Sequence, residues 1–231
     1  MFIPYFDINY LLFSLPAILV GVIATILLNY WTNKYDKIIN TNQINGIDLT
    51  ERTAKRYNLD IRLQVENAAL SDHYNPLTNT LAPSHNSAYN SSITSVGITA
   101  HELGHAIQHR EKSPLIMFRT AIVPIVSFGS GLGYILLVLG IIIGLVQLAW
   151  VGIILFSGTT VFSLVTLPVE IDASNRGLKL IREQQILYPQ ELSGVKKVLS
   201  AAALTYIAAT LQSLGALLYF IFRVQGIGRR D

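Results

Sequence analysis

The chain has 231 residues, of which 51% are hydrophobic and only 13% are charged. This balance is too apolar for an ordinary water-soluble domain and indicates a membrane protein. Cysteine is absent, so disulfides and thiolate metal sites are excluded, and any zinc must be held by histidine and carboxylate side chains. The net charge of +3 is ordinary for a membrane protein and gives no argument for a nucleic-acid partner.

An uncharged stretch near the start of the chain predicts a first membrane span over residues 8–31. Its apolar core from Tyr10 to Leu28 is long enough to cross a bilayer as one helix. The residues before Tyr10 lack the basic region of a secretory signal peptide. We therefore expect a retained anchor.

Residues 34–119 are more polar and predict a compact α+β domain outside the membrane. Asp48 followed by Glu51 predicts a capping box that opens a short helix ending at Tyr57. Residues 61–66 alternate apolar and polar side chains as a half-buried strand does, and a second strand is expected near Leu81. The edge of such a sheet could bind a peptide as an added strand, or the hairpin could simply cover the neighbouring helix.

The motif with the most chemical content lies in a helix predicted over residues 91–111. The sequence His101-Glu102-Leu103-Gly104-His105 places two imidazoles one turn apart, so both can bind one zinc ion. Glu102 would act as the general base that accepts a proton from water at the metal. Apolar residues recur at spacings of three and four along this helix, and Ser91 or Ser92 is suited to cap it. The pattern indicates a metalloprotease; the alternative is a chance match on an exposed helix.

Three further residues of this region have side chains of catalytic types. His73 and Tyr74 are candidates for contact with the substrate or with the oxyanion of a tetrahedral intermediate, although surface loops often carry such residues without a role. His109 follows His105 by one turn, which is too far for a metal held by the first two histidines. We expect His109 to pack or to form a hydrogen bond.

Residues 120–167 carry no charge and predict a hairpin of two spans. As one helix they would be about 70 Å long, whereas one crossing needs about 30 Å. The turn is expected between Gly144 and Trp150. Because a two-span hairpin returns the chain to the side it left, the residues just after Leu167 lie on the same side as the zinc helix.

A helical stretch predicted over residues 168–197, with an interruption near Tyr188 and Pro189, therefore begins on the side of the histidines. Pro168 suits the bend where the span ends. Glu170 could complete a site of two histidines and one glutamate, or it could be a carboxylate favoured by the helix dipole without any metal. Residues 198–222 predict a fourth span, rich in small residues suited to close helix packing.

Four stretches, SDHYNP, HELGHAIQH, LPVEIDAS and KKVLSAAALTY, resemble the YugP-type membrane zinc metallopeptidases of bacteria over nearly the full length of the chain. The resemblance implies a gluzincin-like peptidase, distantly similar to the HtpX and CAAX-prenyl endopeptidases. It implies one zinc ion, with His101, His105 and Glu170 as ligands and Glu102 as the general base.

One position departs from the wider HtpX pattern. Those enzymes usually have an acid four residues after the glutamate ligand, where this chain has Ser174. The partner that orients a zinc histidine is therefore open among Asp172, Ser174 and Asn175.

Two other classes of zinc protease fit less well. A metzincin would need a glycine and a third histidine where this chain has Gln108 and Glu111. An intramembrane protease would carry its zinc helix inside an apolar span, whereas charged residues 110–112 follow the motif directly.

The sequence thus predicts a mainly α-helical membrane protein with about four transmembrane helices and a small zincin-like α+β domain. We expect a multi-pass protein of the bacterial cell membrane that hydrolyses peptide bonds in protein or peptide substrates, membrane proteins among them, at the bilayer surface. Basic residues beside the spans predict a cytoplasmic catalytic domain, although Arg223, Arg229 and Arg230 argue for the opposite orientation. The alternative function is a catalytically silent scaffold or metal-binding adaptor. No feature of the sequence sets the oligomeric state.

Overall fold

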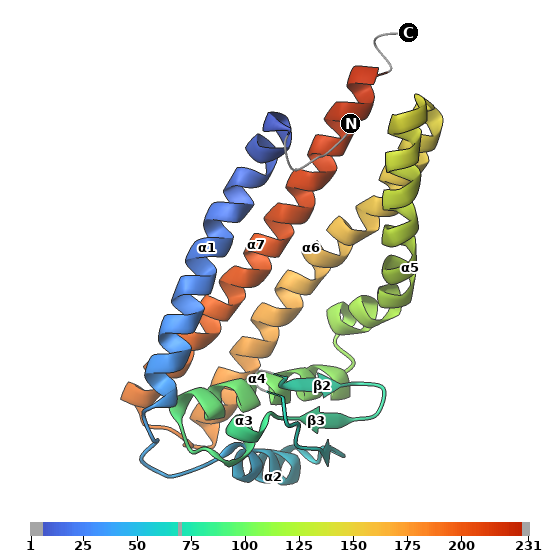
Figure 1. The fold of residues 1–231 in the computed structure, drawn as a ribbon. Helices are drawn as coiled ribbons and strands as arrows, with labels where there is room; N and C mark the ends of the chain where they lie inside the picture. The colour runs from blue at the N-terminus through green and yellow to red at the C-terminus, as the bar shows by residue number, and fades with distance from the viewer. Residues whose placement is uncertain (1–6, 69–70, 228–231) are drawn as a thin grey trace. The chain divides into compact units, whose positions relative to one another are not determined.

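The computed structural model describes residues 7–68 and 71–227 and is mainly helical. Four of its helices are long and apolar enough to cross a membrane, as Figure 1 shows by their length. They are α1 (Ile8–Asp36), α5 (Pro114–Ile143), α6 (Val146–Glu183) and α7 (Pro189–Ile227). The prediction of about four membrane helices is confirmed by helix length and composition. Residues 1–6, which precede the expected anchor, lie outside the described residues, as do Arg229 and Arg230.

The polar part of the chain forms three shorter helices and a small sheet. The helices are α2 (Gly46–Tyr57), α3 (His85–Tyr89) and α4 (Ile93–Arg110). The sheet has the strand order β1 (Arg62–Leu63), β3 (Thr80–Ala82), β2 (His73–Asn75). Strand β3 pairs in parallel with β1 and antiparallel with β2, so β2 is an edge strand. The two strands expected from the sequence are present as β1 and β3.

The chain divides into two compact units. We call the first the helical unit, whose described residues are 7–23, 118–168 and 204–227. The second, the mixed unit, comprises residues 24–117 and 169–203 and contains the sheet together with α2, α3 and α4. The polar domain expected over residues 34–119 is therefore completed by a later segment of the chain.

In the helical unit, α5 and α6 form the expected hairpin. The turn consists of Gly144 and Leu145, and Gly144 has a φ of +74°, a conformation that glycine adopts without strain. A Cβ at Gly152 would overlap the backbone of Leu137, so the two helices approach at backbone distance. Buried apolar side chains from α5, α6 and α7 form the core of this unit: Leu137, Ala149, Ile153, Tyr219, Phe220 and Val224.

In the mixed unit, α4 lies at the centre of the core. The side chains that recur along it at spacings of three and four are buried, as the pattern predicted: Ile93, Val96, Ala100, Leu103 and Ile107. They belong to one cluster with Leu49 of α2, Leu81 of β3 and Leu180 of α6. A helix that is covered on several sides in this way provides a rigid support for the polar residues it carries.

Two expectations about the ends of helices are wrong. The capping box of α2 is formed by Asn45 and Asp48, one turn earlier than the predicted pair of Asp48 and Glu51. The helix that carries Glu170 does not begin at Pro168, because α6 starts at Val146 and continues through the proline. A proline lacks only one backbone donor, and long apolar helices accommodate it. The break between the last two long helices lies at residues 184–188, close to the interruption expected near Tyr188 and Pro189, so the helical stretch predicted over residues 168–197 is divided between α6 and α7.

Candidate metal centre

The two histidines of the motif project from the same side of α4. The helix begins after Ser92, whose hydroxyl accepts a hydrogen bond of 3.0 Å from the backbone N–H of Ser95. His101 and His105 follow one turn apart, and the centroids of their rings lie 4.8 Å from each other. The regular helix therefore holds both imidazoles against one small volume.

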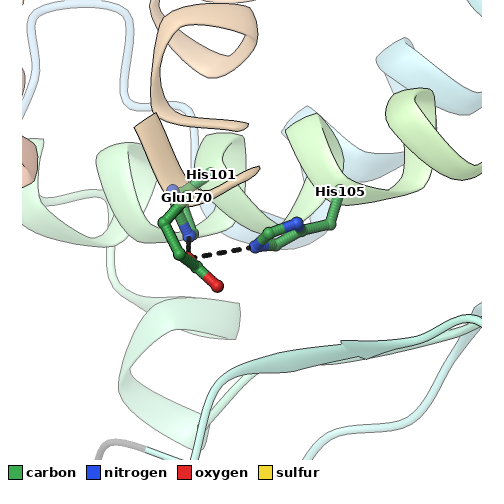
Figure 2. A group of neighbouring side chains, drawn as sticks. All are labelled: His101, His105 and Glu170. Carbon is green, nitrogen blue, oxygen red and sulfur yellow. Dashed lines mark hydrogen bonds and ion pairs between the residues drawn. The ribbon is translucent and has the colours of Figure 1, made fainter. Parts of the chain in front are cut away.

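Glu170 of α6 points into that volume, as Figure 2 shows. Its Oε2 atom lies 3.2 Å from Nε2 of His101 and 3.3 Å from Nε2 of His105. Zinc bound tetrahedrally at about 2.0–2.1 Å from each ligand atom would separate two such atoms by about 3.3 Å. All three ligand atoms lie within 4.8 Å of one another, so they could hold one metal ion.

The hydrogen bond of His105 also suits a cation in this group. Nδ1 of His105 lies 3.0 Å from the amide oxygen Oε1 of Gln108, which can only accept, so we assign a proton to Nδ1. When a metal is bound, the Nε2 lone pair would face it beside the carboxylate of Glu170, which is only 3% exposed. Two acceptors facing each other in a buried site repel unless a cation lies between them. A metal ion satisfies this need, and so would a proton.

Gln108 connects the metal-facing side of α4 to α6. Its side chain is 1% exposed, and its Nε2 donates to the backbone oxygen of Val169 at 2.9 Å and to Oδ2 of Asp172 at 2.7 Å. Arg176 in turn donates to the same oxygen of Asp172 at 2.7 Å. This chain of hydrogen bonds fixes the ring of His105 in the orientation that leaves Nε2 free for a metal.

His101 has a different partner. Its Nδ1 lies 3.0 Å from the hydroxyl of Ser174. Of the three partners proposed from the sequence, Ser174 contacts a histidine directly, whereas Asp172 reaches His105 only through Gln108. Asn175 is exposed and forms no hydrogen bond with either histidine in the described part of the chain. Sequence reasoning missed Gln108, although a glutamine three residues after a ligand on the same helix was the available signal.

Glu102 lies between α4 and the edge of the sheet. Its carboxylate accepts a hydrogen bond from the backbone N–H of Tyr74 in β2. Part of the residue remains open to solvent, but the carboxyl group itself is deeply set. This burial raises the pKa of Glu102 to about 7, against the lowering influence of the neighbouring His101. A carboxyl group of that kind can take up and release a proton near neutral pH.

Comparison with known proteins agrees with this geometry. Residues 10–225 match the family described as "Putative neutral zinc metallopeptidase". The chain belongs to this family. It is also 37% identical over 208 residues to the "Putative membrane protease YugP" of Bacillus subtilis (strain 168). The aligned region covers 86% of this chain and 92% of that relative. No solved structure matches the chain. The resemblance to YugP-type membrane zinc peptidases is thereby confirmed.

In this member of the zinc metallopeptidase family, the structure does not bring the side chains of His73 and Tyr74 to the three ligands. The Tyr74 hydroxyl donates to Oδ1 of Asn79 at 3.0 Å and lies 3.1 Å from Nδ1 of His109. Burial raises the pKa of this hydroxyl above its ordinary value. His73 is exposed, with Nδ1 2.8 Å from the backbone oxygen of Ser71. His109 forms the hydrogen bond expected of it.

Two residues along the outer edge of β2 and directly after it, Tyr74 and Pro76, are poorly suited to donate a backbone hydrogen bond to an added strand. The N–H of Tyr74 is already bound to Glu102. Pro76, two residues further, has no N–H to donate. The contact between Tyr74 and Glu102 therefore supports the interpretation that the hairpin covers α4 rather than the one in which its edge binds a peptide.

Proposed function

We propose that this protein is a zinc-dependent endopeptidase with a gluzincin-like centre in a zincin-like domain. One zinc ion would be held by His101, His105 and Glu170. The observation that carries the proposal is the placement of one buried carboxylate oxygen 3.2 and 3.3 Å from the two Nε2 atoms. Glu102 is covalently next to the first of these histidines. The family description supports the same chemistry.

The proposed division of labour follows from the contacts of each side chain. When bound, zinc supplies a Lewis acid that polarises the scissile carbonyl and makes water a stronger nucleophile. Glu102 accepts the proton that the attacking water loses and passes it to the leaving amine. The N–H of Tyr74 keeps the Glu102 carboxylate in place for this transfer. Ser174 and Gln108 keep both imidazoles turned with Nε2 inward.

We also propose that the protein spans a bacterial membrane several times and works on protein or peptide substrates, membrane proteins among them. Four apolar helices and the name of the Bacillus subtilis relative support the membrane location. Helix α4 ends in Arg110 and is followed by Glu111 and Lys112, which suits a site at the bilayer surface. Basic residues beside the spans support a cytoplasmic catalytic domain.

A silent scaffold or metal-binding adaptor is the competing function. It would retain the three ligands but would have no need for a proton acceptor. The presence of Glu102 beside them, held by a hydrogen bond, favours the enzyme.

The test compares the purified full chain with Glu102→Gln in detergent, using casein and a mixed membrane-protein fraction as substrates. We expect the wild type to cleave, chelator to abolish cleavage and added zinc to restore it. Glu102→Gln should keep its zinc and lose about 100-fold or more of the rate. Cleavage by Glu102→Gln at the wild-type rate would show that the proposed mechanism is wrong. The scaffold would be favoured if the wild type binds zinc but cleaves neither substrate, and if Glu102→Gln traps no substrate that the wild type can cleave.

A further inference from the structure

Aromatic and basic side chains gather where the end of α1 meets the start of α7 within the mixed unit. Trp31 stacks on Tyr35 with ring centroids 5.7 Å apart and contacts Tyr30 edge-on at 4.7 Å. Nζ of Lys34 lies 5.3 Å from the centroid of the Trp31 ring. Nζ of Lys197, from α7, lies 4.7 Å from the same centroid. We call these five residues the Trp31 cluster.

The positive charge of the Trp31 cluster is not neutralised by the protein. Because both ammonium groups lie close to one indole, they are within about 10 Å of each other, roughly one Debye length in 0.1 M salt. Lys37 lies three residues after Lys34, and Lys196 lies directly before Lys197; both are also exposed. In the described part of the chain none of these four lysines forms an ion pair.

The nearest carboxylate in the sequence, that of Asp36, already accepts hydrogen bonds from two other residues. Oδ1 of Asp36 accepts hydrogen bonds from Asn86 at 2.9 Å and from Ser92 at 3.0 Å. Two lysines on one indole therefore repel each other, and an anion between them would relieve that repulsion. A purely structural cation–π contact between α1 and α7 needs only one of the two.

The position of the Trp31 cluster decides what kind of anion it meets. It lies at the polar ends of two helices that are long and apolar enough to span a membrane. Tyrosine and tryptophan are enriched at the level of lipid headgroups. Beside Lys37 the chain exposes two apolar side chains, Ile38 and Ile39, which suit contact with the acyl boundary of a bilayer. If the two helices span the bilayer as proposed above, lysines at this level would meet the phosphates of lipids.

We propose that the Trp31 cluster, with Lys37 and Lys196, binds the headgroup of an anionic phospholipid. The lysines neutralise the net negative charge that such a lipid carries and a zwitterionic lipid does not. The aromatic rings hold the lysine side chains in place and contact the glycerol region. This site is separate from the metal centre and does not depend on peptidase activity.

The experiment measures lipid preference directly. The full chain is reconstituted in phosphatidylcholine vesicles that contain a trace of spin-labelled phosphatidylglycerol or of spin-labelled phosphatidylcholine. Electron paramagnetic resonance then gives the fraction of each label that the protein immobilises. We expect the wild type to prefer phosphatidylglycerol several-fold. Lys34→Gln/Lys197→Gln should reduce that preference by about fivefold or more, since one lysine near a lipid surface accounts for about that factor.

Matched variants separate the site from net charge. Lys55→Gln/Lys179→Gln removes the same charge outside the cluster and should keep the preference. Lys34→Arg/Lys197→Arg should also keep it. No preference in the wild type, or an equal loss in both glutamine variants, would overturn the proposal. Displacement of phosphatidylglycerol by inorganic phosphate in the aqueous phase would overturn it too, because the site would then be one for free phosphate.

Discussion

Gly104 of α4 lies directly against the backbone of Ala173 of α6, so closely that a Cβ at position 104 would overlap the Ala173 carbonyl oxygen. A glycine of α6 lies against the backbone of α4 in the same way. A Cβ at Gly177 of α6 would stand 2.7 Å from the carbonyl oxygen of Ala100 of α4. The two helices therefore cross at backbone distance beside the metal ligands. The glycine of the HELGH motif thus has a packing role: it allows a glutamate on one helix to reach two histidines on the other.

Gly104→Ala should force α4 and α6 apart. The added methyl group would meet backbone atoms, which cannot move aside as a flexible side chain can. We expect a loss of about 3 kcal/mol in the free energy of unfolding and weaker zinc binding. Thermal unfolding and a zinc titration check both. Gly129→Ala on α5, where a Cβ meets nothing within 4 Å, is the control and should leave both unchanged. Equal behaviour of the two variants would contradict the packing role.

Glu170→Ala should abolish most zinc binding, with a loss of more than about 100-fold in affinity, because even a hydrogen-bond partner of a ligand contributes 10–100-fold. Zinc should therefore raise the melting temperature of the wild type but not of this variant. Glu183→Ala on the same helix serves as control. Full retention of zinc by Glu170→Ala would remove Glu170 from the ligand set.

Gln108→Met keeps the length of the side chain but removes the acceptor for Nδ1 of His105 and both donors to α6. We expect zinc affinity to fall by about 10-fold or more. The measurement is competition for zinc against a chelator of known affinity. Asn175→Ala, an exposed change close to the same site, should bind zinc as the wild type does. An unchanged zinc affinity of Gln108→Met would show that the glutamine does not position the ring.

Local patterns predicted the parts of this protein that depend on residues near in sequence. The apolar spacing along α4 gave a correct buried stripe, and uncharged runs gave the four long helices. The pairing of the two histidines follows from helix geometry alone. Glu170 was brought into consideration by topology, because a hairpin of two spans returns the chain to the side it left.

The remaining features depend on contacts between elements distant in the sequence. Gln108 orients His105 only because α6 offers it two acceptors, and no spacing within α4 reveals them. The hydrogen bond from the N–H of Tyr74 to Glu102 requires β2 to lie beside α4. Pro168 was interpreted as the bend where the third span ends and a new helix begins, whereas α6 continues through it, as a long apolar helix can.

Ser174→Asp should tighten zinc binding. The hydroxyl of Ser174 is a neutral partner for Nδ1 of His101, whereas a carboxylate in its place would make the imidazole a more basic ligand. We expect an affinity up to about 10-fold higher, and an affinity about 10-fold lower for Ser174→Ala. The same chelator competition measures both variants. If aspartate and alanine weaken binding equally, the position tolerates only a small hydroxyl and the electrostatic argument is wrong.

Tyr74→Phe separates the two roles considered for this tyrosine. Its hydroxyl is engaged by Asn79 and His109, while its backbone N–H holds Glu102, and the substitution removes only the hydroxyl. We expect kcat to change by less than about threefold, whereas loss of an oxyanion donor would cost about 100-fold or more. Stability should fall by about 1 kcal/mol at neutral pH.

The pH dependence of that stability difference has a defined sign. Because burial raises the pKa of Tyr74 in the folded protein, its protonated form stabilises the fold fully below pH 10, the ordinary pKa of the group. This contribution is lost as the pH rises from there through the raised pKa. The difference in melting temperature between the wild type and Tyr74→Phe should therefore shrink in alkali. Tyr57→Phe, whose hydroxyl donates to Glu183, is the control for activity and should keep the wild-type kcat. A 100-fold fall in kcat for Tyr74→Phe alone would make the Tyr74 hydroxyl part of the catalytic machinery.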